Sequence, residues 1–317
     1  MKKTLLAAAV ALGATAFTAG SAMAEQFVTV LTGGTSGVYY PMGVAISKAY
    51  ADNIPDVRTS VQSTKASVEN LNLVQRGRGE LAFALGDSVA NGWEGIEEAG
   101  FPQKLDKIRG LAAIYPNVIQ IVARGDSGIK TLEDLKGKRV SVGAPKSGTE
   151  LNARKIFEAA GMTYDDFEKT EYLSFGESVE LMKNRQLDAT LLSAGLGVSA
   201  IRDLASTTPV AIVEVPADVV TAIGEPVFIS TTVPAGTYEG VTEDVTTAAI
   251  RNFLITSSEL SDDLVYNMTK ELFENRDALL AAHSAAEGFV LETAAEGMPL
   301  PLHPGAEKYY KEQGVLQ

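Results

Sequence analysis

The sequence predicts an α/β fold divided into two lobes. Short β-branched segments alternate with longer segments of helical periodicity, a pattern typical of largely parallel sheets with helices on both faces. The chain of 317 residues is long enough for two lobes of ordinary domain size. It contains no cysteine, so we expect an apolar core to hold the fold together without disulfides.

The individual elements can be assigned from the pattern. Helix starts are indicated by the S-x-x-E capping boxes at 147–150 and 174–177 and by Ser67 as an N-cap, and Gly77 and Gly161 suit helix ends. Expected helices run through Ala45 and Ala49, over 68–75 and over 151–160; expected strands lie at 27–31, 81–85, 118–122, 139–142, 187–192 and 210–215.

The first 24 residues have the features of a cleaved secretory signal peptide. Lys2 and Lys3 precede an apolar stretch at 5–17, and Ala22-Met23-Ala24 is a small-x-small cleavage site. We therefore expect the mature protein to start at Glu25. No later segment approaches the roughly 18 apolar residues of a membrane span, and no cysteine is present to carry a lipid anchor. A Gram-negative periplasm is the expected location.

The charge of the chain argues against two classes of partner. The formal net charge is −13, and it becomes more negative when the two leader lysines are removed. Such a chain repels nucleic-acid phosphates and anionic lipid headgroups, so neither is expected as a partner.

Three loops rich in Gly, Ser and Thr follow predicted strands. They span 32–37, 62–67 and 143–149. Ligands of α/β sheets bind beyond the carboxyl ends of strands, and a helix N-terminus there attracts a carboxylate or phosphate. Each loop alone is better explained as a cap or a tight turn, since caps are commoner than ligand sites. Three such loops in one chain favour a ligand cleft, with Thr64 among its candidate contacts.

Charged and aromatic residues beside these loops extend the candidate site. Lys65 and Lys146 lie just before predicted helix starts, where a cation is unfavourable unless a bound anion compensates; two solvated surface lysines are the alternative. Asp87 follows the strand 81–85, where it could meet an ammonium group or cap the next helix. Tyr39 and Phe175 could form a wall against the ligand.

Signals for catalysis and metal binding are weak. The two histidines, His283 and His303, belong to no H-E-x-x-H motif, and no G-x-S-x-G motif or metal-ligand spacing occurs. The loop 143–148 has the spacing of a phosphate-binding loop, but Thr149 replaces the essential lysine. We expect no catalytic residue, no metal and no cofactor.

The same loops carry a family resemblance along nearly the whole mature chain. The sequence resembles the TAXI solute-binding proteins, which are receptors of tripartite ATP-independent periplasmic (TRAP) transporters. The matching segments are Thr32–Pro41, Ser67–Leu71, Asp134–Pro145, Ser147–Glu150 and Pro301–Ala306 with Tyr309-Tyr310.

The resemblance implies a type II periplasmic binding protein fold, with hinge-crossing segments and a ligand cleft between the lobes. It implies lobe 1 at 25–113 plus 225–317 and lobe 2 at 114–224, with crossings near 114–117 and 224–228. The ligand would contact Thr35, Ser36, Tyr39, Ser67, Ser147 and Thr149. Lys65 and Lys146 stand where the family often has glycine, and Gly86-Asp87-Ser88 replaces a more usual glutamine-containing stretch. The first departure favours a more anionic ligand, and the second an amino group.

The resemblance also implies a function. A monomeric, non-enzymatic receptor would bind glutamate, 2-oxoglutarate or another small carboxylate and deliver it to an integral-membrane TRAP permease. A periplasmic sensor that signals to a membrane two-component kinase is the alternative, since both would use the same cleft. A secreted enzyme is disfavoured because no nucleophile–base pair is evident.

Overall fold

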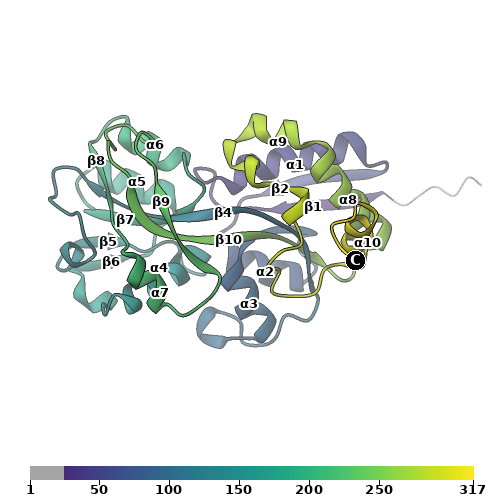
Figure 1. The fold of residues 1–317 in the computed structure, drawn as a ribbon, viewed down its shortest axis with the longest axis horizontal. Coiled ribbons are helices and arrows are strands. Elements are labelled where there is room, and N and C mark those ends of the chain that lie inside the picture. Colours follow the sequence, from purple (N-terminus) through teal and green to yellow (C-terminus); the bar gives the residue numbers. More distant parts are fainter. Residues whose placement is uncertain (1–24) are drawn as a thin grey trace, which may run out of the picture.

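The computed structural model describes residues 25–317, so the predicted leader lies outside the described residues. Two lobes share one mixed sheet with the strand order β2-β1-β3-β10-β4-β7-β5-β6, while β8 pairs with β4 and β9 with β10 (Figure 1). The type II periplasmic binding protein architecture is confirmed. Within residues 25–317 no helix is both long and apolar enough to cross a bilayer.

The first lobe is built on three parallel strands. β1 lies between β2 and β3, and β3 continues to the antiparallel β10. All five residues of β3 are buried, as a central strand covered on both faces requires. The strands are β1 (Gln26–Leu31), β2 (Val57–Gln62) and β3 (Leu81–Leu85), and the helices are α1 (Tyr39–Asn53), α2 (Ser67–Gln75), α3 (Gly86–Glu94), α8 (Asp262–Glu274), α9 (Arg276–Ala282) and α10 (Pro304–Glu312).

The second lobe repeats this arrangement on the other side of the molecule (Figure 1). β5 pairs in parallel with both β6 and β7, and β7 then meets the antiparallel β4. The elements are β5 (Arg139–Ser141), β6 (Lys169–Glu171), β7 (Ala189–Ala194), β8 (Val210–Val213), β9 (Phe228–Val233), α4 (Gly148–Ala159), α5 (Phe175–Lys183), α6 (Ser199–Ala205) and α7 (Ala217–Ala222).

Two long antiparallel strands cross between the lobes, β4 (Ile108–Arg124) and β10 (Val245–Ser257). The first parts of β4 pair with the end of β10 in lobe 1, and the rest of β4 pairs with β7 and β8 in lobe 2. The β10–β4 register shifts between Arg251 and Phe253, opposite Pro116. A bulge and a proline interrupt regular pairing where two lobes have to move against each other.

Contacts in the structure favour a return crossing that lies later in the chain than the expected 224–228. Phe228 and Ile250 pack with the second-lobe core, and β9 pairs with the first half of β10. The chain returns to lobe 1 only where β10 passes Arg251. We therefore propose lobe 1 as 25–115 plus 252–317 and lobe 2 as the residues between.

The predicted elements agree with the structure where the apolar pattern is local. β3 has the expected bounds, and the other five expected strands and three expected helices are all present. The expectation of largely parallel sheets holds for the outer strands of each lobe only, because β4 and β10 run antiparallel to their neighbours. β2, β6, β9 and β10 were not predicted.

Helix starts follow the sequence signals at two of three positions. Ser147 and Ser174 each accept a hydrogen bond from a backbone N–H, of Glu150 and Glu177 respectively, and the Ser174 box is complete. Ser67 is not an N-cap: it is the first helical residue of α2, after Ala66 with φ of 67°. The Ser67 hydroxyl instead accepts from the Leu85 N–H across the sheet.

Candidate ligand cleft

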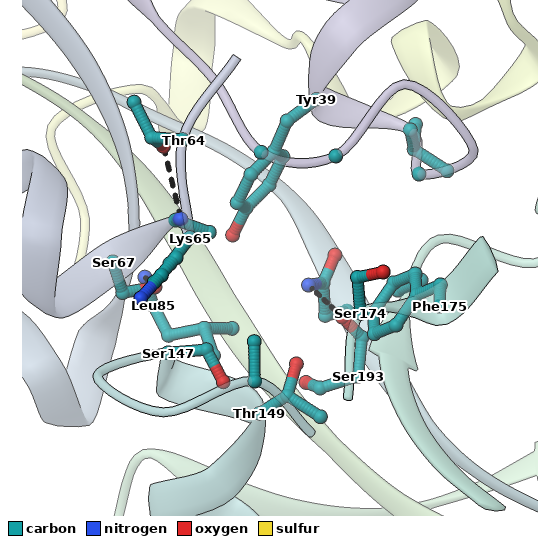
Figure 2. Close-up of a pocket in the computed structure, with 18 residues that line it drawn as sticks. Tyr39, Thr64, Lys65, Ser67, Leu85, Ser147, Thr149, Ser174, Phe175 and Ser193 are labelled. Carbon is teal, nitrogen blue, oxygen red and sulfur yellow. Dashed lines mark hydrogen bonds between the residues drawn. The ribbon is translucent and has the colours of Figure 1, made fainter. Parts of the chain in front are cut away.

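A cavity of about 100 Å³ lies between the lobes at the crossing strands. Both lobes contribute to its wall, and Figure 2 shows the Tyr39 hydroxyl pointing into the cavity opposite Thr149 and Ser193. The lining residues are Gly33, Gly34, Gly37, Val38, Tyr39, Thr64, Lys65, Ala66, Ser67, Leu85, Asn117, Ala144, Ser147, Thr149, Ser174, Phe175, Ser193 and Ala194.

Four helices begin at this cavity. α1 and α2 of lobe 1 start at Tyr39 and Ser67, and α4 and α5 of lobe 2 start at Gly148 and Phe175. The first N–H groups of a helix lack intrahelical acceptors, and the helix dipole is positive there. Within residues 25–317, Lys65 is the one formally charged residue that lines this cavity. The cavity therefore favours an anion.

Seven predicted ligand-binding residues line this cavity, and four do not. Thr35 is exposed and Ser36 half-buried in the first loop, outside the lining. The Ser36 carbonyl accepts hydrogen bonds from the Ala200 N–H and the Ser199 hydroxyl of α6, so this residue joins the lobes. The seven lining residues are Tyr39, Thr64, Lys65, Ser67, Ser147, Thr149 and Phe175.

The two candidate lysines lie at different sites on the protein. Lys65 lies at the cavity. Lys146 is exposed and borders a different surface groove, beside Arg154 and Tyr172. Its φ of 63° places it in the left-handed region, which glycine adopts more easily than lysine. The turn that starts α4 thus directs the Lys146 side chain away from the cleft.

The lobes are closed over the cavity in this structure. A Cβ added to Gly148 of lobe 2 would lie 2.6 Å from the Ser67 hydroxyl oxygen and 2.6 Å from a Leu85 methyl of lobe 1. The Arg154 guanidinium donates to the Glu98 carbonyl across the same boundary, at 3.3 Å. Glycine at position 148 allows two helix starts, α2 and α4, to meet around the ligand space.

A polar network ties the cavity wall to the crossing strands. The Tyr39 hydroxyl donates to Asn252 Oδ1 at 2.8 Å, and Asn252 Nδ2 donates to Asn117 Oδ1 at 2.7 Å. Asn117 Nδ2 in turn donates to the Ser193 carbonyl at 2.7 Å. All four residues are buried. Burial raises the pKa of Tyr39 well above its ordinary value, so this hydroxyl stays protonated.

Asp87 lies behind the cavity wall and not in it. Its carboxylate accepts from the Ser88 N–H at 2.6 Å and from Asn152 Nδ2 of lobe 2 at 2.8 Å. Asn152 Oδ1 accepts from the Ser193 hydroxyl at 2.9 Å. The Asp87 side chain is only 2% exposed, and this burial raises its pKa to about 7. Asp87 therefore does not line the cavity, and it is linked to the lining residue Ser193 only through Asn152.

Three polar lining residues, Asn117, Ser174 and Ser193, were not predicted as ligand-binding residues from the sequence. Ser193 could have been found, since it lies near the carboxyl end of a predicted strand. Ser174 was noticed only as a helix cap. Asn117 gives no local signal, because it stands inside a strand whose crossing role depends on both lobes.

The histidines have structural roles. His303 Nδ1 accepts from the Gly305 N–H at 3.1 Å and caps α10. His283 Nδ1 accepts from the Ala285 N–H at 3.0 Å. Within residues 25–317 no group of three or more His, Asp or Glu side chains is arranged to hold a metal ion.

The model of the NMT1-like family matches residues 30–314. The chain belongs to the NMT1-like family. Among solved structures, this NMT1-like protein is similar to the periplasmic aliphatic sulphonate binding protein SsuA from Escherichia coli, with a TM-score of 0.50 and 15% identity over 90% of this chain and 83% of that chain. It is also similar to a putative L-cystine ABC transporter protein from Listeria monocytogenes, with a TM-score of 0.51 and 16% identity over 81% and 94% of the two chains.

A third similar structure is a mutant of OxyR from Corynebacterium glutamicum, with a TM-score of 0.50 and 14% identity over 85% and 69% of the two chains. At such identities these likenesses show the fold alone. The ligand of the NMT1-like protein has to be argued from its own cavity.

Proposed function

We propose that this NMT1-like protein is a periplasmic solute receptor that binds glutamate, 2-oxoglutarate or another small carboxylate and delivers it to a TRAP permease. The observation that carries the proposal is the convergence of four helix N-termini and Lys65 on one inter-lobe cavity. Backbone N–H groups and serine and threonine hydroxyls provide the donors that a desolvated carboxylate requires. The TAXI-like motifs of the sequence favour the TRAP transporter over other permeases.

Lobe closure would then signal occupancy to the permease. An anion between the helix starts stabilises the closed form, because its contacts in the two lobes exist together only when the cleft is shut. No catalytic step is part of this proposal, and we expect purified protein to return the ligand unchanged.

The direct test is a thermal-shift screen of residues 25–317 against dicarboxylates, 2-oxo acids, acidic and neutral amino acids, sugars and metal ions. A ligand at 100 times its Kd adds about 2.7 kcal/mol to the stability of the folded state. We expect shifts of several degrees with small carboxylates only. Stabilisation by sugars alone, with no carboxylate effective, would contradict the proposal.

The two lysines provide a matched pair for the charge argument. Lys65→Ala should weaken carboxylate binding by about 1 kcal/mol, or roughly fivefold, because an exposed lysine at a cavity mouth is partly screened by solvent. Lys146→Ala should leave the affinity unchanged, since this side chain borders another groove. Isothermal titration calorimetry at low and high salt checks both. If both variants lost the same amount of carboxylate affinity, the effect would come from long-range electrostatic attraction and not from a local contact of Lys65.

A further inference from the structure

Four hydroxyl groups in the cavity wall donate their hydrogens to other protein groups. Two of them, Thr64 and Ser174, donate to the Thr32 carbonyl and to the Glu177 carboxylate. The Tyr39 hydroxyl donates to Asn252, and the Ser193 hydroxyl donates to Asn152. A hydroxyl has one hydrogen and two lone pairs. Each group therefore presents lone pairs to the cavity and acts there as an acceptor, although a serine or tyrosine in isolation could do either.

The direction of the Tyr39 bond is fixed by backbone carbonyls. A carbonyl oxygen only accepts, so the Asn252 NH₂ must face the Tyr115 carbonyl, 2.9 Å away. The Asn117 NH₂ faces the Ser193 carbonyl for the same reason. With its NH₂ committed, Asn252 presents Oδ1 to Tyr39, and the tyrosine has to donate.

The direction of the Ser193 bond is fixed by Asp87. An ionised carboxylate has no hydrogen, so Asn152 must direct its NH₂ to Asp87 and its oxygen to Ser193. All three side chains are nearly inaccessible to solvent, with exposures of 2%, 0% and 4% for Asp87, Asn152 and Ser193. Water is thereby excluded as an alternative partner along this relay, which joins lobe 1 to the ligand wall of lobe 2.

We propose that Asp87, acting through Asn152, makes Ser193 a fixed hydrogen-bond acceptor, so that the cavity selects a carboxylate ligand that also carries a protonated amine, namely an α-amino acid in preference to the corresponding 2-oxo acid. This inference rests on the proposed carboxylate-receptor function and narrows its ligand class. An ammonium group donates to both Ser193 and Tyr39. The oxygen of a 2-oxo group meets the same lone pairs without a hydrogen and leaves the Ser193 acceptor unpaired, which a binding site penalises strongly.

The test compares matched ligands that differ only in this group. Dissociation constants of the wild-type chain 25–317 are measured calorimetrically at pH 8 for L-glutamate with 2-oxoglutarate, and for L-alanine with pyruvate. In the pair that binds, we expect the amino acid to bind at least tenfold more tightly. Equal affinity, or preference for the 2-oxo acid, overturns the inference while leaving the carboxylate receptor intact. Binding of no carboxylate overturns both.

Asp87→Asn reverses the relay without changing its shape. The new Oδ1 still accepts from the Ser88 N–H, which leaves an NH₂ facing Asn152. Asn152 must then turn its oxygen towards position 87 and its NH₂ towards Ser193, whose hydrogen is released into the cavity. We expect the amino-acid preference to fall at least tenfold, through a gain in affinity for the 2-oxo acid. A merely structural role of Asp87 would weaken both ligands together and leave their ratio unchanged, which would overturn the relay.

Two further variants test this assignment. Ser193→Ala should lower the affinity for the amino acid severalfold and raise that for the 2-oxo acid, because the unpaired acceptor is removed. Thr149→Val is the matched control in the same wall, because the Thr149 hydroxyl makes no hydrogen bond within residues 25–317 and can rotate to donate or accept. It should affect both ligands alike. Unequal effects in Thr149→Val, with equal effects in Ser193→Ala, would place the selecting group elsewhere and overturn the assignment.

Discussion

Gly148→Ala should weaken ligand binding by about 5- to 150-fold while leaving the apo protein as stable as wild type. The added Cβ would lie 2.6 Å from Ser67 Oγ and 2.9 Å from Ser67 Cβ. Rotation of the serine moves only the oxygen, so the clash remains unless the lobes separate. Overpacking of this kind costs about 1–3 kcal/mol, and here it acts on the closed state alone. Gly148 lies in the first turn of α4, where alanine is a good helix former.

Gly176→Ala is the matched control for this result. Gly176 is also in the first turn of a lobe 2 helix and faces lobe 1, but its added Cβ would lie 3.6 Å from Ser36 Oγ, an ordinary contact. Its affinity should match wild type. The measurements are titration calorimetry for the best carboxylate and thermal unfolding without ligand. If Gly148→Ala lowered the stability of the apo protein, the glycine would be required for the folding of lobe 2 and not for closure of the lobes.

Lowering the pH through about 7 should favour closure of the unliganded protein. In the closed structure burial raises the pKa of Asp87 to about 7, mainly by desolvation. In an open form the carboxyl is solvated and its pKa lies near the ordinary value of about 4. The closed form therefore binds one more proton between these limits. The ratio of closed to open molecules should rise by up to about tenfold per unit fall in pH below 7, and should be constant well above it.

The charged groups around Asp87 do not reverse the direction of this pH dependence. Lys155 of α4 lowers its pKa and Glu225 raises it, and these two side chains form an ion pair with each other. Tyr39 of α1 is uncharged over this range. From the other elements packed on α3, Glu69 accepts from the Lys65 N–H and Arg251 donates to the Glu296 carbonyl.

The cysteine-free sequence makes closure directly measurable. Spin labels at Ala51→Cys on α1 and Glu180→Cys on α5 report the inter-lobe distance by pulsed electron resonance from pH 5 to 8.5. Asp87→Asn should abolish the pH dependence. Asp218→Asn should keep it, because Asp218 occupies the first turn of α7 and bonds the next N–H in the same way, but is exposed. A wild-type distance distribution that does not change with pH would refute the linkage.

Local sequence signals were sufficient for parts of the site. The Ser147 and Ser174 caps follow from one short motif each, and both bring a helix N-terminus to the cavity. Lys65 and Lys146 looked equivalent in sequence, yet only Lys65 lines the cavity. The difference arises from the left-handed backbone at Lys146, which residue type alone does not reveal.

The sequence by itself determined the α/β class, most buried strands and the position of the Gly- and Ser-rich loops. These features depend on neighbours a few residues apart. The tertiary structure alone decided where the chain returns between lobes, that Asn117 and Ser193 face the ligand space, and that Asp87 acts through Asn152. These features depend on contacts between residues such as Asp87 and Asn152, which are 65 positions apart. Long-range pairing of polar groups leaves no periodic pattern, since each partner is satisfied only when both lobes are folded and closed.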